Sequence, residues 1–360
     1  NAMDTVKITI NDIELPVPKG TTILEAARQI DIKIPTLCYL NMDAFHIANQ
    51  TASCRVCLVE VLGRPSLVPA CSEKVLEGMV IRTDSAKAVA ARRTSVELLL
   101  SNHPKECLTC QKNLECELQE LAQRLGITNI SFEGEMMQYP IDHSSLSLVK
   151  NPNKCVMCRR CETMCNEVQT CGILSAVSRG FDAYVGPAFH LDMADTSCTF
   201  CGQCVAVCPT GALTEVNNVR DVVDALNDPS KHVVAQVAPA IRVAIGEMFG
   251  LEPGTITTDQ LATAIRRLGF DGVFDTDYAA DLTILEEASE LAHRIEHGGR
   301  LPILTSCCPA WVRFIEHQFP DLLDVPSTCK SPQMMMGTVV KTYYAEKMGI
   351  DPKDIVVVSI

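Results

Sequence analysis

The stretch CVMCRRCETMC, residues 155–165, decides the fold of the central part of this chain, and its cysteine spacing is repeated in CTFCGQCVAVCP, residues 198–209. In both stretches, gaps of two residues separate three thiols on one tight loop, and a fourth thiol follows after a gap of three residues. Three thiols so spaced can surround one iron-sulphur cubane, while the fourth points across to a neighbouring cluster. The two motifs therefore predict a ferredoxin-type domain with two 4Fe-4S clusters.

This spacing rule also assigns the ligands of each cluster. The first cluster takes Cys155, Cys158, Cys161 and Cys208. The second cluster takes Cys198, Cys201, Cys204 and Cys165. Asn166 stands where the first motif would usually carry proline, which does not alter a ligand. A pair of zinc knuckles is the alternative, but zinc sites take their four ligands in pairs and have no use for a third thiol at the same spacing.

A third group, upstream, combines one imidazole with three thiols: His103, Cys107, Cys110 and Cys116. It lies in a short, otherwise helix-forming stretch. A lone histidine beside an apolar helix is more often a surface or core residue, but this one precedes three thiols that lack a fourth partner. We therefore predict a third 4Fe-4S cluster in which a neutral imidazole replaces one thiolate, which changes the net charge of the cluster and tunes its potential.

A fourth, looser group of cysteines lies near the start of the chain: Cys38, Cys54, Cys57 and Cys71. Alternating apolar residues at Val6, Ile8 and Ile10, followed by a turn and an apolar helical stretch over residues 22–30, indicate a small strand-helix-strand unit. Fifteen residues separate the first two cysteines, where plant-type 2Fe-2S proteins have four, so the loop must be longer. We predict a 2Fe-2S cluster here; free structural cysteines are the alternative.

Composition limits the class of protein. A formal net charge of -13 disfavours nucleic acid as a partner, because phosphates are bound by basic patches. No uncharged apolar run is long enough to span a bilayer, since the best candidate, residues 232–250, contains Arg242 and Glu247. Nineteen cysteines in a chain of 360 residues do not fit a short secreted disulphide scaffold. We therefore expect a cytoplasmic metalloprotein without a membrane span.

From residue 219 onward, apolar strands alternate with helices. Strands are expected at 233–237, 272–274 and 302–304, and helices at 240–249 and 280–297. Such alternation is typical of an α/β domain with a parallel sheet. Chemistry gathers at the loops beyond the carboxyl ends of parallel strands. Three loops qualify, at residues 238–240, 275–277 and 305–311.

The last of these loops reads TSCCPAW, residues 305–311, and it is similar to the first H-cluster signature of the iron-iron (FeFe) hydrogenases. The whole chain resembles the catalytic subunit of a multi-cluster bacterial hydrogenase of this family. The blocks before residue 219 also resemble the large iron-sulphur subunit of respiratory complex I and some formate dehydrogenases. These alternatives lack the signature at 305–311, which therefore distinguishes them from the hydrogenases. An electron-transfer subunit is the second hypothesis.

The resemblance implies roles for individual residues. Cys308 would be a thiolate ligand of the H-cluster cubane, and Cys307 would exchange a proton with the di-iron subsite. The family's proton path maps onto Glu287, Ser327, Glu290 and Arg294. The three charged members are spaced to share one face of a helix; an exposed carboxylate-guanidinium pair is the alternative interpretation. The resemblance also implies cofactor contacts near the diatomic ligands for Ala238, Pro239 and Gln333.

The later H-cluster signatures of the family would follow the apolar segment 355–360, at which this sequence stops. Cys308 is the single H-cluster ligand in the sequence, so we expect a shortened form of a longer enzyme, with an H-cluster in the full-length protein only. As written, the chain should hold the relay clusters but evolve no hydrogen. Cys171 and Cys329 lie outside all of these groups and are predicted to be buried thiols.

The predicted fold class is a multidomain combination of α+β and α/β parts. Residues 1–85 would form a 2Fe-2S ferredoxin domain of the β-grasp type, 86–138 a small helical domain with the histidine-ligated cluster, 139–218 the two-cluster ferredoxin domain, and 219–360 the first part of the H-cluster domain. No nicotinamide-binding fingerprint occurs in the sequence. The expected partners are therefore ferredoxin or a flavin and iron-sulphur subunit that oxidises NAD(P)H, with protons and H2 as substrates.

Overall fold

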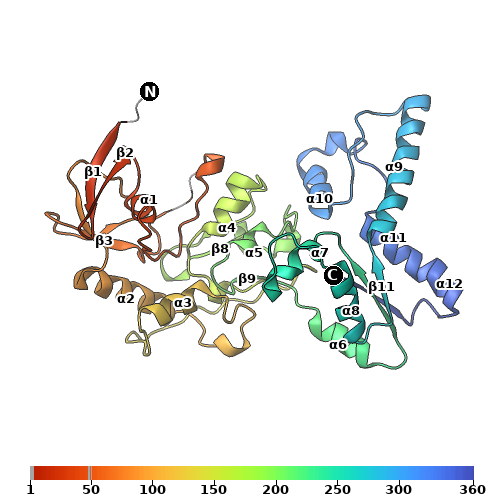
Figure 1. Cartoon of the computed structure of the whole chain (residues 1–360), viewed down its shortest axis with the longest axis horizontal. Helices are drawn as coiled ribbons and strands as arrows, with labels where there is room; N and C mark the ends of the chain where they lie inside the picture. Colours follow the sequence, from red (N-terminus) through yellow and green to blue (C-terminus); the bar gives the residue numbers. More distant parts are fainter. Residues whose placement is uncertain (1–3, 48, 50) are drawn as a thin grey trace. The chain divides into compact units, whose positions relative to one another are not determined.

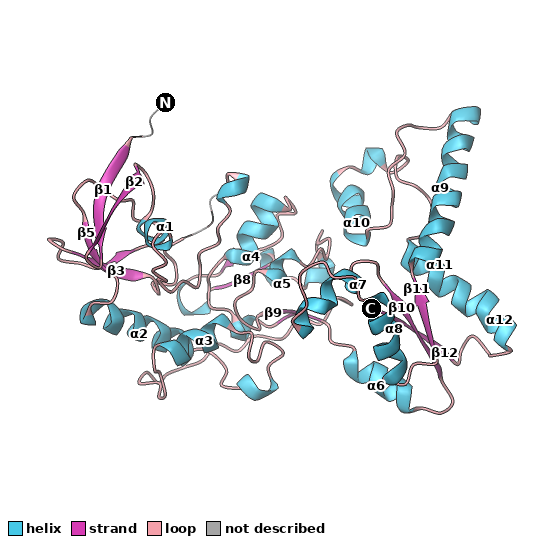
Figure 2. Cartoon of the chain, in the orientation of Figure 1, coloured by secondary structure: helices cyan, strands magenta, loops and turns pink. Residues whose placement is uncertain are grey.

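The computed structural model describes residues 4–47, 49 and 51–360 and divides into two compact units, Asn1–Val216 and Asn217–Ile360. Each unit is described by itself; their elements are labelled in Figure 1 and coloured by type in Figure 2. In the described part of the chain, no helix combines the length and the apolar character needed to cross a membrane.

The first unit begins with a five-stranded sheet of order β2-β1-β5-β3-β4. Its strands are β1 (Thr5–Ile10), β2 (Ile13–Pro18), β3 (Leu58–Val61), β4 (Val68–Pro69) and β5 (Val80–Arg82). β1 and β2 form an antiparallel hairpin, and β1 pairs in parallel with β5. Ile8 and Ile10 point into the core while their neighbours are more exposed, so the alternation in the sequence correctly predicted the buried face.

Helix α1 (Ile23–Arg28) packs against this sheet through four buried apolar residues. It begins with a capping box, because the Thr22 side chain accepts from the Glu25 amide at 3.2 Å and the Glu25 carboxylate accepts from the Thr22 amide at 2.9 Å. The reciprocal pair satisfies two amide groups that a helix start would otherwise leave without partners. The helical stretch predicted at residues 22–30 is therefore confirmed as helix α1, which spans Ile23–Arg28.

Two helices follow the sheet, α2 (Ala86–Ser101) and α3 (Glu117–Arg124). The Arg92 side chain of α2 is buried and its Nε donates to the Leu58 carbonyl of β3 at 2.8 Å, which ties the helix to the sheet. The segment between the two helices, which carries the predicted histidine and cysteine ligands, was expected to be helix-forming. It is a loop with one short 3-10 turn, Cys107–Thr109, because Pro104 interrupts the backbone hydrogen bonding of a helix.

The remainder of the first unit is built from short elements around the two repeated cysteine motifs. It contains two antiparallel strand pairs and two one-turn helices: β6 (Leu148–Lys150) with β9 (Leu213–Glu215), β7 (Ser175–Val177) with β8 (Tyr184–Gly186), α4 (Arg160–Thr163) and α5 (Gln203–Ala206). A π-helical turn, Met164–Val168, directly follows α4. The core of this region consists largely of cysteine side chains together with Leu148, Leu174 and Leu213.

The second unit contains a parallel three-stranded sheet of order β11-β10-β12, made by β10 (His232–Val237), β11 (Gly272–Asp275) and β12 (Ile355–Ser359). Successive residues of β10 face opposite sides: Val233 and Ala235 pack with α8 (Thr258–Arg267), and Val234 packs with α9 (Asp277–His297). The other helices of this unit are α6 (Val219–Asn227), α7 (Ile241–Ala244), α10 (Pro309–Gln318), α11 (Pro332–Val339) and α12 (Ala345–Met348). The parallel sheet and the long helix α9 agree with the sequence analysis.

Two expectations for the second unit need correction. Residues 302–304 do not form a strand; Leu304 makes a single bridge to Pro326, because its backbone bonds to Val325 and Ser327 and not to the sheet. The expected helix at 240–249 is divided into one α-helical turn, α7, and a 3-10 segment, Ile245–Phe249. The Thr257 amide and hydroxyl both donate to the Arg242 carbonyl at 2.8 Å, so this carbonyl of α7 is bonded outside the helix.

Candidate metal centres

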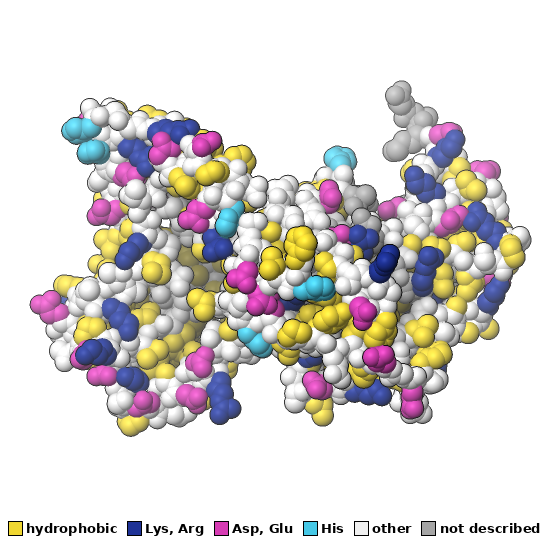
Figure 3. Space-filling model, turned by 180° about the vertical axis from the view of Figure 1, so that it is seen from behind, with side chains coloured by type: hydrophobic (Ala, Val, Ile, Leu, Met, Phe, Trp, Pro, Cys, Tyr) yellow, Lys and Arg dark blue, Asp and Glu magenta, His cyan; other side chains and the backbone are white. Residues whose placement is uncertain are grey.

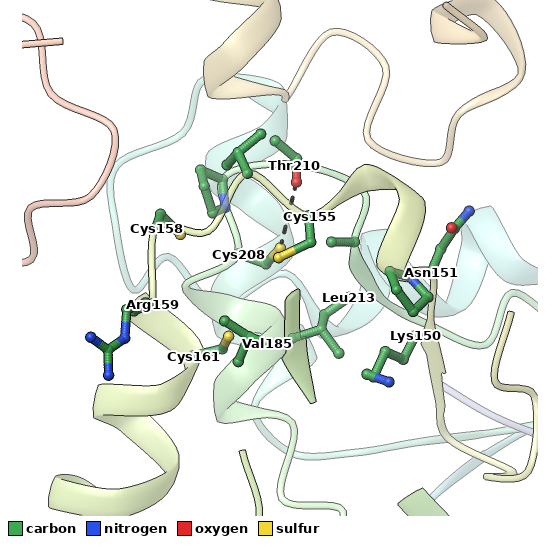
Figure 4. A pocket seen from close by; sticks show the side chains of 14 residues that line it. Lys150, Asn151, Cys155, Cys158, Arg159, Cys161, Val185, Cys208, Thr210 and Leu213 are labelled. Carbon is green, nitrogen blue, oxygen red and sulfur yellow. Dashed lines mark hydrogen bonds between the residues drawn. The ribbon is translucent and has the colours of Figure 1, made fainter. Parts of the chain in front are cut away.

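Four predicted cysteine ligands surround one cavity in the first unit. Figure 4 shows Cys155, Cys158, Cys161 and Cys208 directed toward this hollow, with Lys150 and Arg159 at its edges. Cys208 comes from the second motif and the other three from the first, as the predicted crossing of motifs requires. Burial raises the pKa of the Cys158 thiol to about 12 and also raises the pKa values of Cys155 and Cys161. A buried thiol of this kind loses its proton when its sulfur binds a metal ion, so the chemistry of this donor set fits an iron cluster.

A second cavity collects the remaining thiols of the two motifs. It is lined by Cys165, Cys198, Cys201 and Cys204, and also by a fifth thiol, Cys171. Burial raises the pKa of Cys198 to about 11 and that of Cys204 to about 12. Burial also raises the pKa of Cys165, an effect that the Ile173 amide opposes in part by donating to its sulfur at 3.4 Å. The expectation that Cys171 and Cys329 are buried was wrong, because both thiols are half-buried.

The third predicted group also shares a cavity, lined by His103, Cys107, Cys110 and Cys116. His103 Nδ1 is buried and has no hydrogen-bond partner in the described part of the chain. Burial, with a smaller effect of Lys154, lowers the pKa of His103 to about 4, so its imidazole is neutral near pH 7. A neutral imidazole with an orphaned nitrogen beside three thiols fits a metal ligand.

Two neighbours shape this third cavity from outside its own loop. The Lys154 ammonium donates to the Cys110 sulfur at 3.4 Å, which places a positive charge beside the thiol group. At Gly211, a Cβ atom would lie 2.7 Å from Cys110 Sγ, so the chain needs glycine at this position. Sequence reasoning missed both contacts, because both residues are distant along the chain from the cysteines that they touch.

The four cysteines of the first group lie close together and buried at the edge of the first sheet. Hydrogen bonds from Cys54 and Cys71 lower the pKa of Cys38, and the same bond to Cys38 raises the pKa of Cys54. The Ala52 amide donates to Cys71 Sγ at 3.3 Å. The fifteen-residue spacing between Cys38 and Cys54 therefore does not prevent the four sulfurs from meeting, and the set fits a small 2Fe-2S cluster.

The motif TSCCPAW lies in the second unit at the start of α10. Cys308 occupies the position before the helix, and Pro309 is the first helical residue, where its missing amide hydrogen costs nothing. Cys307 and Cys308 are both exposed, and Cys307 Sγ lies 3.5 Å from Thr305 Oγ1. Both thiols are thus accessible to a ligand.

The predicted proton path is partly assembled on α9. Arg294 forms an ion pair with Glu290 at 2.5 Å, and the Ser327 hydroxyl donates to Glu290 Oε2 at 3.3 Å. Burial alone would raise the pKa of Glu290, but hydrogen bonds from Arg294 and Thr328 outweigh this effect and lower it. Glu287 lies half-buried one turn earlier, and no hydrogen bond joins it to the group in the described part of the chain.

Two members of this group were missed in the sequence. The Thr328 amide and hydroxyl both donate to Glu290 Oε2, at 3.0 and 3.1 Å, and the Cys329 thiol lies 3.9 Å from the same oxygen. Thr328 and Cys329 directly follow Ser327 in the sequence, and this position could have indicated that they belong to the group. The Ser306 hydroxyl also donates to the Cys329 carbonyl at 2.9 Å, which connects the loop of Cys307 to this group.

The three residues expected near the cofactor's diatomic ligands do not share one cavity. Ala238 lines a hollow with Arg242 and Asp275 at the carboxyl ends of β10 and β11, and Pro239 beside it is exposed. Gln333 lines a different hollow, and its carbonyl accepts from Gln236 Nε2 at 3.3 Å.

Comparison with known proteins supports a common origin for this arrangement. A family described as iron only hydrogenase large subunit, C-terminal domain, matches residues 231–360. The NADP-reducing hydrogenase subunit HndD of Solidesulfovibrio fructosivorans is 57% identical over 99% of this chain and 62% of its own length. The resemblance to the iron-only hydrogenases is confirmed. Iron hydrogenase 1 of Clostridium pasteurianum is 37% identical over 98% of this chain and 61% of its own length.

Further matches cover the iron-sulphur parts. A 2Fe-2S iron-sulfur cluster binding domain matches residues 3–86, an NADH-ubiquinone oxidoreductase-G iron-sulfur binding region matches 92–131, and a 4Fe-4S binding domain matches 195–214. One chain of an NAD+-reducing [NiFe]-hydrogenase crystal structure aligns with a TM-score of 0.53 and 28% identity, over 58% of this chain and 87% of that one. The present chain spans about three fifths of the length of the two hydrogenase relatives.

Proposed function

We propose that this chain is part of the catalytic subunit of an iron-only hydrogenase, which interconverts protons, electrons and H2. The observation that carries the proposal is the combination of four thiol-lined centres in the first unit with the TSCCPAW loop in the second. Similarity to two hydrogenases over nearly the whole chain supports it.

The first unit would serve as the electron relay. Its four centres would hold one 2Fe-2S cluster and three 4Fe-4S clusters, of which one has His103 as a ligand. Bound clusters of this kind transfer single electrons at potentials set by their ligands and surroundings. The chain's contribution is to bury most of these sulfurs, which disfavours added negative charge, and to place amide or ammonium donors beside some of them, which favours the reduced, negatively charged clusters.

The second unit would handle protons. Cys308 would bind the cubane of an H-cluster, and Cys307 would hold a proton at its sulfur, because a thiol titrates nearer to neutral pH than a hydroxyl. Glu287, Glu290, Arg294 and Ser327 would carry protons between Cys307 and water. Ala238, Pro239 and Gln333 would line the cofactor.

We further propose the four-part division at residues 85, 138 and 218, a cytoplasmic location, and electron exchange with ferredoxin or an NAD(P)H-oxidising subunit. An NADP-reducing relative supports the last point. A second candidate is a purely electron-transferring subunit. It is favoured by the 35% identity of the NADPH-Fe(3+) oxidoreductase subunit alpha of Geobacter sulfurreducens over 58% of this chain and 24% of its own length.

Infrared spectroscopy of the anaerobically purified full-length protein, produced with the maturation enzymes, separates the two candidates. A hydrogenase shows bands of carbonyl and cyanide ligands on iron and evolves H2 from a reduced viologen. Iron-sulphur signals without these bands, and without H2, would support the electron-transfer subunit.

Replacement of Cys307 by serine tests the proton step. Serine keeps the size of the side chain but holds its proton far more tightly, so the full-length matured protein with Cys307→Ser should lose nearly all turnover while keeping its iron content. Thr305→Val, which removes the hydroxyl next to this thiol, is the control and should keep most activity. A Cys307→Ser protein with most of its activity would contradict the role of this thiol.

A further inference from the structure

The second cavity of the first unit holds one thiol more than a cubane cluster needs. It is lined by five cysteines, whereas the equivalent cavity built around the first motif is lined by four. The additional thiol is Cys171, which belongs to neither motif. The two cavities thus provide an internal comparison between a centre with a spare thiol and a centre without one.

The backbone holds Cys171 beside Cys165, the ligand that reaches this cavity from the first motif. Cys165 lies in the π-helical turn Met164–Val168, after which the chain reverses through left-handed residues at Thr170 (φ 54°) and Gly172 (φ 69°). The Cys171 amide donates to the Cys165 carbonyl at 2.9 Å. This tight loop returns the chain to the point that it left six residues earlier.

The Cys171 side chain reaches the opposite wall of the same cavity. Its sulfur lies 3.5 Å from the hydroxyl of Thr199, a buried residue that directly follows Cys198. The sulfur is also 3.5 Å from the Gln169 carbonyl. A thiol is a weak hydrogen-bond donor, so these contacts position Cys171 in the wall without holding it by a strong bond.

We propose that Cys171 is a reserve ligand of this cluster, able to bind the iron atom that Cys165 otherwise binds. Three thiolates of the second motif would hold three corners of the cubane, which leaves one corner for either thiol of the 165–172 loop. In the exchange, the Cys171 sulfur forms an Fe–S bond and releases its proton, and the Cys165 sulfur leaves iron and takes up a proton. No electron is gained or lost.

This inference rests on the proposed cluster ligands and extends them. Cys171 already lines the cavity that the three thiols of the second motif line, and its amide is bonded to the Cys165 carbonyl. The matched position in the first cavity is Cys208, for which the described residues offer no fifth thiol.

The test uses the whole chain, reconstituted anaerobically with iron and sulfide, as four variants: Cys165→Ala, Cys171→Ala, the double replacement, and Cys208→Ala. Iron content and low-temperature EPR after mild oxidation are measured. We expect Cys165→Ala and Cys171→Ala to keep the iron of the unsubstituted chain. The double variant and Cys208→Ala should lose iron or show the signal of a [3Fe-4S] cluster. A Cys165→Ala protein that behaves like the double variant would overturn the proposal.

Alkylation of free thiols, followed by mass spectrometry, gives a second readout that does not depend on stability. Cys171 should be alkylated in the reconstituted unsubstituted chain and protected in Cys165→Ala. Equal labelling in the two proteins would refute the exchange of ligands. An unsubstituted chain that binds no 4Fe-4S cluster would instead refute the ligand assignment itself, and the reserve role with it.

Discussion

A methyl group at residue 211 would lie 2.7 Å from the Cys110 sulfur, closer than two such atoms can approach. Gly211→Ala should therefore displace Cys110 and disturb the histidine-ligated cluster, at a cost to stability of roughly 1–3 kcal/mol. EPR of the reduced chain should show a selective loss of that cluster's signal. Gly134→Ala is the matched control, since nothing lies within 4 Å of the added methyl group. An unchanged spectrum in Gly211→Ala would contradict the cavity geometry.

The carboxylate of Glu290 should make the stability of the second unit depend on acid pH. Its pKa is lowered in the fold, so its stabilising effect is complete above the ordinary value near 4.5 and is lost as pH falls through the folded value. Glu290→Gln should remove this dependence and cost roughly 1.5–3 kcal/mol near neutral pH, since Arg294 loses a charged partner.

Denaturant titration of the Glu290→Gln chain at several pH values measures this effect. Glu286→Gln, an exposed carboxylate on the same helix, is the control and should change little. If the two variants respond to pH in the same way, the Glu290 group does not have the proposed environment.

At the scale of elements, an ion pair joins two ligand-bearing segments of the first unit. The Arg160 guanidinium of α4 donates twice to the Glu117 carboxylate of α3, at 2.5 and 2.9 Å. Arg160 lies between two cysteines of the first motif, and Glu117 directly follows Cys116. The arginine side chain is only 7% exposed, whereas the Glu117 side chain is 41% exposed, so water screens the carboxylate side of the pair.

We expect Arg160→Met to lower stability by roughly 1.5–3 kcal/mol and to speed iron release from both neighbouring clusters. The release rate to a coloured chelator, recorded under anaerobic conditions, measures this. Arg220→Met removes a pair whose partners are 91% and 70% exposed, and it should have almost no effect. Equal release rates in the two variants would show that the Arg160 pair does not stabilise the clusters.

Elements with a clear periodic pattern of apolar residues were predictable from the sequence. The alternation at Ile8 and Ile10 was sufficient for β1, because it marks the buried face of that strand. Helix α9 also forms where the sequence predicted a helix, although its buried residues are Ala279 and Thr283, both near its start. The prediction of a strand at 302–304 was wrong because a short apolar run does not show which segment its backbone will bond to. The Leu304 backbone bonds to Val325 and Ser327. The expectation of a helix-forming stretch around His103 was wrong because Pro104 interrupts the backbone hydrogen bonding of a helix.

At the scale of the whole molecule, the grouping of cysteines was predictable and their surroundings were not. Cys208 and Cys165 line the cavities that the cysteine spacing predicts for them, since the motif itself encodes the crossing. Contacts such as Gly211 with Cys110, or Thr328 with Glu290, depend on the folded chain. The net charge of -13 does not form one acidic patch on the face shown in Figure 3, where acidic and basic side chains are interspersed.

A redox titration of the reconstituted chain, followed by low-temperature EPR, tests the central claim most directly. The account predicts one 2Fe-2S signal and three 4Fe-4S signals, one of which shows coupling to an imidazole nitrogen that is lost in His103→Ala. His143→Ala, an exposed histidine, should leave all four signals intact. Fewer clusters, or no nitrogen coupling in any of them, would contradict the proposed electron relay.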